Sequence, residues 1–221
     1  MTDASTMPES TGGADSAEGE GLVRTIGIYL YPWADALDVV GPWEVMSAWA
    51  GLLEQAGAPS ASGLDLFTVA DSLEPVIVGG LLLTPTHVWA SAPDLDLLIV
   101  PGGCTTMMED LVGAPARLRS LSESGTVIAS VCTGTKLLAD AGLVDGRSVT
   151  THWQYADELR SHPGGLIVDR EARFIDHGDV VTSAGVSAGI DMALHLVRRF
   201  AGEVIARDVR RALQYDPAPP V

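Results

Sequence analysis

The sequence predicts a single α/β domain, an α/β/α sandwich in which the strands are mainly parallel. Two observations predict this class. Short apolar runs rich in β-branched residues, such as residues 96–101 and 127–131, have the composition of strands buried on both faces of a parallel sheet. Segments with apolar residues at helical spacing separate such runs along most of the chain, and this alternation is typical of a parallel sheet covered by helices.

In the first half of the domain, a helix is predicted from Pro42, because proline is favoured in the first turn of a helix and apolar residues follow at helical spacing. Residues 76–79 and 81–84 are predicted to form a hairpin about Gly79 and Gly80. The other elements expected here are strands at residues 25–31, 64–70, 96–101 and 127–131 and a helix at residues 107–122.

In the second half, Ser187 is expected to cap a helix whose apolar positions extend through Val197. The other elements expected here are helices at residues 136–139, 155–160 and 203–213 and short strands at residues 148–151, 166–168, 173–175 and 180–182. No internal repeat is visible, so one domain is expected at residues 24–215.

The two ends of the chain differ in composition from this domain. Residues 1–23 hold several acidic residues among many Ser, Thr and Gly and contain no Lys or Arg, which favours a disordered acidic tail. Residues 216–221 are rich in proline and are expected to form a second short tail.

Charge and composition exclude several classes of protein. The chain has 221 residues, of which 47% are hydrophobic, so it can form a full core, and its net charge of −16 argues against binding to nucleic acid or to an anionic membrane. No apolar run could span a membrane and no signal peptide is recognisable. The two cysteines, Cys104 and Cys132, form no disulfide framework. We therefore expect a cytoplasmic protein.

Cys132 is the first candidate for chemistry. It follows the predicted strand at 127–131 and precedes a predicted helix, which is the strand–turn–helix arrangement of a nucleophile elbow. Small residues, Ser130 and Gly134, stand two positions before and two after it, as the tight turn requires. The start of a helix favours a thiolate. The alternative is that Cys132 is a small apolar residue of the core, which is the more common role of a free cysteine.

Asp38 is the expected partner of Cys132. It is placed in the loop between the first strand and the helix from Pro42, and loops after parallel strands meet at the same edge of the sheet. A carboxylate beside a thiol can act as an acid or a base. Gly102 and Gly103 follow another strand and could direct backbone N–H groups into the site. The alternatives are a turn or cap role for Asp38 and an ordinary tight turn at the glycine pair.

Five histidines could pair with the cysteine. His152 is the best placed, because it follows a strand that ends at the same edge of the sheet. Of the other four, His195 lies in a predicted helix, His177 lies in a predicted turn and His162 directly precedes Pro163; His87 is the fourth. No spacing of Cys and His matches a zinc site, and there is no phosphate-binding glycine motif, so no metal and no cofactor are expected.

Taken together, these segments resemble the ThiJ/PfpI superfamily of glutamine-amidotransferase-like domains. The segments that carry the resemblance are residues 38–45 (DVVGPWEV), 98–103 (LIVPGG), 129–147 (ASVCTGTKLLADAGLVDGR), 150–153 (TTHW) and 182–197 (TSAGVSAGIDMALHLV). The resemblance implies a flavodoxin-like fold with a cysteine at the elbow, and commonly a homodimer. It also implies a catalytic pair of Asp38 and Cys132, with Thr133 directly after the nucleophile.

Within this superfamily the chain is similar to two branches. One is isonitrile hydratase, which implies conversion of a small uncharged isonitrile to an N-substituted formamide through a cysteine thioimidate. The other is the sensor domain of AraC-type regulators, which implies ligand or redox sensing without turnover. The resemblance assigns Gly102 and Gly103 to the oxyanion loop and His152 to the substrate pocket. The tryptophans Trp33, Trp43 and Trp153 could add an apolar wall to that pocket or pack in the core. Thr133 stands where the peptidases of the superfamily have histidine, which argues against peptidase activity.

Overall fold

The centre of the molecule is a seven-stranded sheet. The computed structural model describes residues 23–57 and 63–217. In spatial order the strands are β10 (Phe174–Asp176), β11 (Val180–Ser183), β7 (Val127–Val131), β6 (Leu97–Val100), β1 (Thr25–Tyr29), β2 (Asp65–Ala70) and β5 (His87–Val88). Every neighbouring pair is parallel except β10 with β11. The mainly parallel sheet confirms the predicted fold class.

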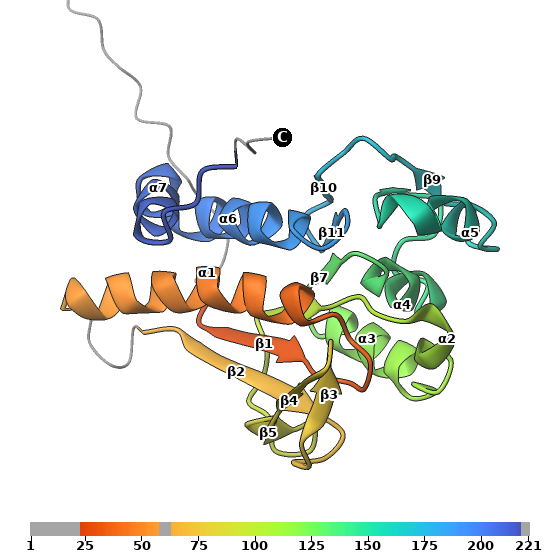
Figure 1. Ribbon diagram of the computed structural model, residues 1–221, viewed down its shortest axis with the longest axis horizontal. Coiled ribbons are helices and arrows are strands. Elements are labelled where there is room, and N and C mark those ends of the chain that lie inside the picture. The colour runs from red at the N-terminus through yellow and green to blue at the C-terminus, as the bar shows by residue number, and fades with distance from the viewer. Residues whose placement is uncertain (1–22, 58–62, 218–221) are drawn as a thin grey trace, which may run out of the picture.

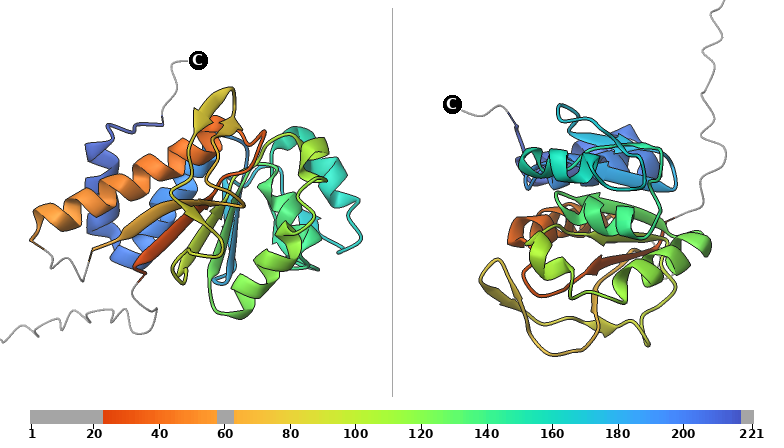
Figure 2. Two further views of the ribbon diagram at one scale, coloured as in Figure 1. Left: turned by 90° about the horizontal axis from the view of Figure 1, so that it is seen from below. Right: turned by 90° about the vertical axis from the view of Figure 1, so that its right-hand side faces the viewer.

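Helices cover both faces of this sheet (Figures 1 and 2). One face is covered by α1 (Ala36–Gln55) and α6 (Ala188–Ala201), and α7 (Glu203–Ala212) packs against both of these helices. The other face is covered by α3 (Ala114–Glu123) and α4 (Gly134–Asp140). No helix in the described part of the chain is long and apolar enough to span a bilayer.

Smaller elements surround the main sheet. Two two-stranded sheets pair β3 (Val76–Val78) with β4 (Leu81–Leu83) and β8 (Ser148–Val149) with β9 (Ile167–Val168). The first is the hairpin predicted about Gly79 and Gly80. Short helices follow at α2 (Thr105–Met108), η2 (Trp153–Tyr155) and α5 (Ala156–Arg160).

The start of α1 differs from the prediction. The helix begins at Ala36, so Asp38 lies in its first turn and Pro42 lies inside it; the expected loop at Asp38 and helix start at Pro42 are wrong. The fixed φ angle of proline is compatible with a helix, but inside a helix proline removes the hydrogen bond to the carbonyl four residues earlier, which is that of Asp38, and its ring crowds that carbonyl. The earlier start fixes the position of the Asp38 side chain by helical geometry.

Three smaller expectations also change. The single helix expected at residues 107–122 is two helices, because Gly113 ends the turn after α2 and Pro115 opens α3. Ser187 precedes α6, but its side chain makes no capping hydrogen bond. Val23 is buried in the core, so packing begins one residue before the predicted boundary at residue 24. The rest of the tail at residues 1–23, and residues 218–221 of the second tail, lie outside the described residues.

The central strands supply the core. All four residues of β6 have an exposed fraction of 0%. We expect Leu98→Ala to lower the free energy of unfolding by about 3 kcal/mol, because it leaves a cavity between two layers of helices. Leu82→Ala removes the same atoms from a residue that is 70% exposed, and should change stability by less than about 0.5 kcal/mol. Urea denaturation of the two variants measures the difference; equal losses would contradict this account of the core.

Candidate active site

The site lies where the strand order of the sheet reverses. From β1 the chain crosses to β2 on one side, and later enters β6 on the other side of β1, with β7 next to β6. Loops that leave the carboxyl ends of β1 and β6 therefore diverge and leave a crevice, which is where open α/β sheets bind ligands. These are the loops that contain Asp35 and Gly102, and Cys132 follows the neighbouring strand β7.

Cys132 occupies a strained turn between β7 and α4. Its φ angle is 58°, a value that few residues other than glycine adopt. Its N–H group faces the carbonyl oxygens of Ser183 and Ala184, each at 3.2 Å, which ties the turn to the end of β11. A side chain at Gly134 would overlap the carbonyl oxygens of Val100 and Pro101. The small residue predicted there is thus required by the close approach of the loop after β6.

Backbone strain is concentrated around Cys132. Among the described residues, four that are not glycine have positive φ, and three of them, Trp33, Cys132 and Val186, line one cavity. Val186 is β-branched, so its φ of 47° is especially unfavourable. Each such residue costs about 1–3 kcal/mol and persists only when its surroundings hold it, which is a common feature of functional sites.

Asp38 lies directly beside the loop after β6. The N–H of Gly102 donates to Asp38 Oδ2 at 2.9 Å. A Cβ at Gly102 would come within 2.8 Å of that oxygen and within 2.7 Å of the Thr133 hydroxyl, so only glycine fits between the two side chains. Asp38 has an exposed fraction of 0%, and its second oxygen, Oδ1, is buried without a hydrogen-bond partner among the described residues.

Thr133 and Gly103 form a mutual contact. The Thr133 hydroxyl accepts from the Gly103 N–H and donates to the Gly103 carbonyl, each at 2.8 Å. The Gly103 N–H is therefore engaged, and the expectation that it directs a hydrogen bond into the site is wrong. The N–H groups that act on the sulfur of Cys132 come from Thr133 and Val186. The Val186 donor was missed, because residues 183–189 were interpreted only as the approach to a helix.

Burial sets the ionisation of the pair. It raises the pKa of the Cys132 thiol to about 12, the negative charge of Asp38 adds to the increase, and hydrogen bonding from Val186 and Thr133 lowers the pKa by less. Burial also raises the pKa of Asp38 to about 7, against the hydrogen bond from Gly102. The expected thiolate is therefore not the resting form. Near neutral pH the sulfur carries its proton, and Asp38 is poised between acid and base.

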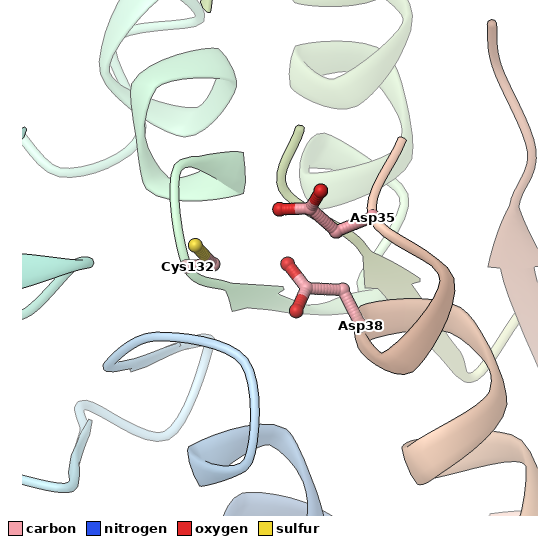
Figure 3. A group of neighbouring side chains, drawn as sticks. All are labelled: Asp35, Asp38 and Cys132. Carbon is pink, nitrogen blue, oxygen red and sulfur yellow. The ribbon is translucent and has the colours of Figure 1, made fainter. Parts of the chain in front are cut away.

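A second carboxylate, Asp35, joins the pair. Asp35 precedes α1, three residues before Asp38, and both side chains point toward Cys132 (Figure 3). One oxygen of each carboxylate and the sulfur lie within 4.8 Å of one another, close enough for a single divalent cation to reach all three. Asp35 was not among the predicted site residues, because the helix was expected to begin only at Pro42. Residues three apart at the start of a helix lie on one face, and this spacing was the available signal.

The three side chains adjoin a cavity of about 520 Å³. Trp33, Asp35, Cys132, His152 and Tyr155 are among the residues that line it. Its volume suits a small organic ligand. Gly102 and Asp38 lie behind this lining, whereas Gly103 and Thr133 contribute to it.

His152 lies at the cavity as predicted. Its Nδ1 accepts from the N–H of Gln154 at 3.3 Å, and its ring packs against the rings of Trp153 and Tyr155. Of the tryptophans considered, Trp33 lines the cavity, Trp43 packs against the core, and Trp153 is 65% exposed.

The remaining histidines lie elsewhere in the structure. His195 pairs with Asp176, His162 lies near Asp140, and the His177 ring contacts the carbonyl of Ser148. His87 lies in β5, and its ring packs against that of Phe67. None of these four lines the cavity at Cys132.

The fold and the cavity define a flavodoxin-like α/β domain with a buried cysteine at the end of a central strand. A model of the DJ-1/PfpI family matches residues 24–199, and the chain belongs to this family. It is 35% identical over 202 residues to isonitrile hydratase from Pseudomonas putida, which covers 90% of this chain and 82% of that one. These matches confirm the resemblance stated from the sequence.

Two further relatives extend the comparison. The chain is 36% identical over 114 residues to the HTH-type transcriptional regulator CdhR from Pseudomonas aeruginosa, but that match covers 52% of this chain and 34% of the regulator. A crystal structure of a ThiJ/PfpI family protein from Pseudomonas syringae superimposes with a TM-score of 0.76 at 29% identity, covering 98% of this chain and 84% of that one. The family thus includes both enzymes and regulators.

The charge of Asp38 should suppress alkylation of Cys132. Asp38→Asn removes this charge, so the pKa of the thiol should fall and alkylation by iodoacetamide should accelerate by about tenfold for each unit of the fall. The acceleration should appear above pH 7 and fade below it, where Asp38 of the unmodified protein is itself neutral. Peptide mass spectrometry measures Cys132 separately, with the exposed Cys104 as internal reference. An unchanged ratio of the two rates would contradict the coupling.

The same substitution should change the pH dependence of stability. Between about pH 4 and pH 7 the folded protein retains the Asp38 proton that the unfolded chain has released, because the pKa rises from 3.8 to about 7 on folding. The free energy of unfolding therefore falls as the pH rises through this window. Asp38→Asn should remove that loss. The free energy of unfolding of the variant should therefore exceed that of the unmodified protein by an amount that grows with pH, to at most roughly 4 kcal/mol.

Urea denaturation at several pH values measures this advantage. Asp65→Asn is the matched control, because Asp65 is exposed and is the first residue of β2, at the edge of the sheet opposite to the site. A constant difference between Asp38→Asn and the unmodified protein across the window would show that Asp38 is ionised when buried.

Proposed function

We propose that this protein hydrates an isonitrile to an N-substituted formamide. The observation that carries the proposal is the buried pair of Cys132 and Asp38 beside a cavity of about 520 Å³. The 35% identity to an isonitrile hydratase, over most of both chains, supports the choice of reaction. Cys132 acts as the nucleophile at an elbow, Asp38 transfers protons, and Thr133 holds the elbow against the loop after β6.

The first step forms a thioimidate. The thiol proton of Cys132 passes to the Asp38 carboxylate, and the sulfur forms a bond to the terminal carbon of the isonitrile. Asp38 returns the proton to that carbon, so the sum of thiol and isonitrile is R–N=CH–S–Cys132. Transfer of the proton from a thiol with a pKa of about 12 to a carboxylate with a pKa of about 7 is unfavourable by itself, so it accompanies formation of the sulfur–carbon bond. Because Asp38 titrates near neutral pH, it can both accept this proton and return it.

The second step releases the product. Water adds to the thioimidate carbon, its oxygen becomes bonded to that carbon, and one of its protons goes to the nitrogen. The carbon–sulfur bond then breaks, the remaining proton of the added water passes to the sulfur through Asp38, and the N-substituted formamide leaves the Cys132 thiol. The N–H groups of Thr133 and Val186 stabilise the sulfur whenever it carries negative charge, during both attack and departure. The Thr133 N–H was expected in this role, and the Val186 N–H replaces that of Gly103, to which the resemblance assigned it.

A sensor domain without turnover is the second candidate, and the similarity to CdhR favours it. Binding of a ligand in the cavity at Cys132 would serve either role. Redox sensing is less well supported, because oxidation requires thiolate character and the pKa of Cys132 is raised. The homodimer stays a prediction from the resemblance.

Isonitrile turnover decides between the two candidates. The purified protein should convert alkyl or aryl isonitriles to formamides, Cys132→Ser should abolish the reaction, and Asp38→Asn should slow it by roughly a hundredfold or more. Asp65→Asn should leave the rate unchanged. Gas chromatography of the products and mass spectrometry of a Cys132 adduct measure both steps. Absence of both formamide and adduct at high protein concentration would reject the hydratase and leave the sensor.

A further inference from the structure

The cavity at Cys132 contains a carboxylate without a partner. Asp35 occupies the N-cap position of α1, where aspartate normally accepts a hydrogen bond from the helix backbone, yet its side chain makes no capping bond. Within the described parts of the chain it has no ion pair or side-chain hydrogen bond at all, and it points toward Cys132 (Figure 3). Because the Asp35 carboxylate makes no capping hydrogen bond, it is available to a ligand.

No cationic side chain competes for this carboxylate. Among the described residues that line the cavity there is no Lys or Arg. Asp38 lies beside Asp35 and Cys132, so the charge in this region is negative whenever the two carboxylates are ionised. The chain as a whole has a net charge of −16, which attracts cations to the crevice and repels anions. An anionic substrate is therefore disfavoured both at a distance and in the cavity.

Aromatic side chains line the same cavity. Trp33 lies two residues before Asp35, lines the cavity and is 49% exposed, and its backbone adopts a φ of 70°. Its backbone is fixed on both sides: the N–H donates to the carbonyl of Ile77 at 2.9 Å, and the carbonyl accepts from the N–H of Cys104 at 3.2 Å. Tyr155 adds a second ring to the lining.

A carboxylate together with aromatic rings, without a competing cation, is the combination that recognises an organic ammonium group. A neutral substituent would cover the Asp35 carboxylate without replacing the water that solvates it, which costs free energy. An ammonium group with apolar carbons satisfies the carboxylate by its charge and the rings by its surface.

We propose that the cavity binds a substrate whose isonitrile-bearing substituent ends in a methylated ammonium group, with Asp35 as the counter-charge and Trp33 as the aromatic contact. The inference rests on the proposed function only for taking this cavity as the substrate site. It changes the expectation of an uncharged substrate, which the resemblance to isonitrile hydratase implied and which an apolar wall of tryptophans would suit.

Binding of two isosteric probes tests this without any turnover. Choline carries a trimethylammonium group, and neohexyl alcohol has the same shape with carbon in place of the charged nitrogen. By isothermal titration calorimetry the unmodified protein should bind choline roughly tenfold more tightly than the alcohol, the scale of one cation–π contact with one partly exposed ion pair. Added salt should weaken choline binding and leave the alcohol unaffected.

Matched variants identify the residues responsible. Asp35→Asn should remove most of the preference for choline. Asp65→Asn removes the same charge at the start of β2, far from the cavity, and should retain the preference. Trp33→Leu should reduce the preference and Trp33→Phe should keep part of it, because phenylalanine preserves an aromatic face. Circular dichroism spectra of the variants verify that each is folded. Equal affinities for the two probes, or a preference that survives Asp35→Asn, would overturn the proposal.

Turnover separates this inference from the proposed function. Trimethylammonioethyl isonitrile and neohexyl isonitrile form the corresponding reactive pair. If choline is preferred but neither isonitrile reacts, the hydratase fails and the cation site stands, as a sensor's ligand site. If both isonitriles react with equal kcat/KM, the hydratase stands and the cation site fails.

Discussion

The site depends on the close contact between the loop after β6 and the two elements on either side of it. Gly102 lies between Asp38 of α1 and Thr133 of the turn after β7, and it leaves no room for a Cβ atom. Its N–H holds Asp38, while Thr133 engages both the N–H and the carbonyl of Gly103. This contact positions the first turn of α1 and the turn at Cys132 relative to each other. The distance between acid and nucleophile follows from it.

Removal from water then determines the chemistry. Asp38 is wholly buried, and Cys132 is 3% exposed, so desolvation raises the pKa of both groups. Two negative charges so close together are unfavourable, and the pair therefore holds a proton near neutral pH. A pair of this kind transfers a proton instead of maintaining a thiolate, which suits addition to an uncharged carbon better than reversible oxidation. The strained backbone at Trp33, Cys132 and Val186 directs side chains and N–H groups to this one cavity.

Much of the fold was predictable because it rests on local patterns. The buried strands β6 and β7 have apolar β-branched sequences that solvent-exposed strands do not have, and the hairpin of β3 and β4 follows from its glycine pair. The start of α1 was not predictable from Pro42, because proline is favoured in the first turn of a helix and disfavoured further in, yet here it lies inside the helix. Because the helix begins at Ala36, Asp38 lies in its first turn instead of in a loop, and Asp35 at its N-cap lies on the same face as Asp38.

The sequence by itself determined which residue is the nucleophile candidate and which strand, turn and helix surround it. It could do so because the tight turn at Cys132 needs small residues at Ser130 and Gly134, and this requirement is local. It also determined that Asp38, Gly102 and His152 approach the same edge of the sheet, because parallel strands bring their carboxyl ends together. Only the tertiary structure decided which N–H groups are free, that the Gly103 N–H is occupied by Thr133 and that Val186 faces the sulfur. The ionisation of Cys132 was decided there too, since burial depends on every layer that packs over the site and outweighs the local effect of the helix start.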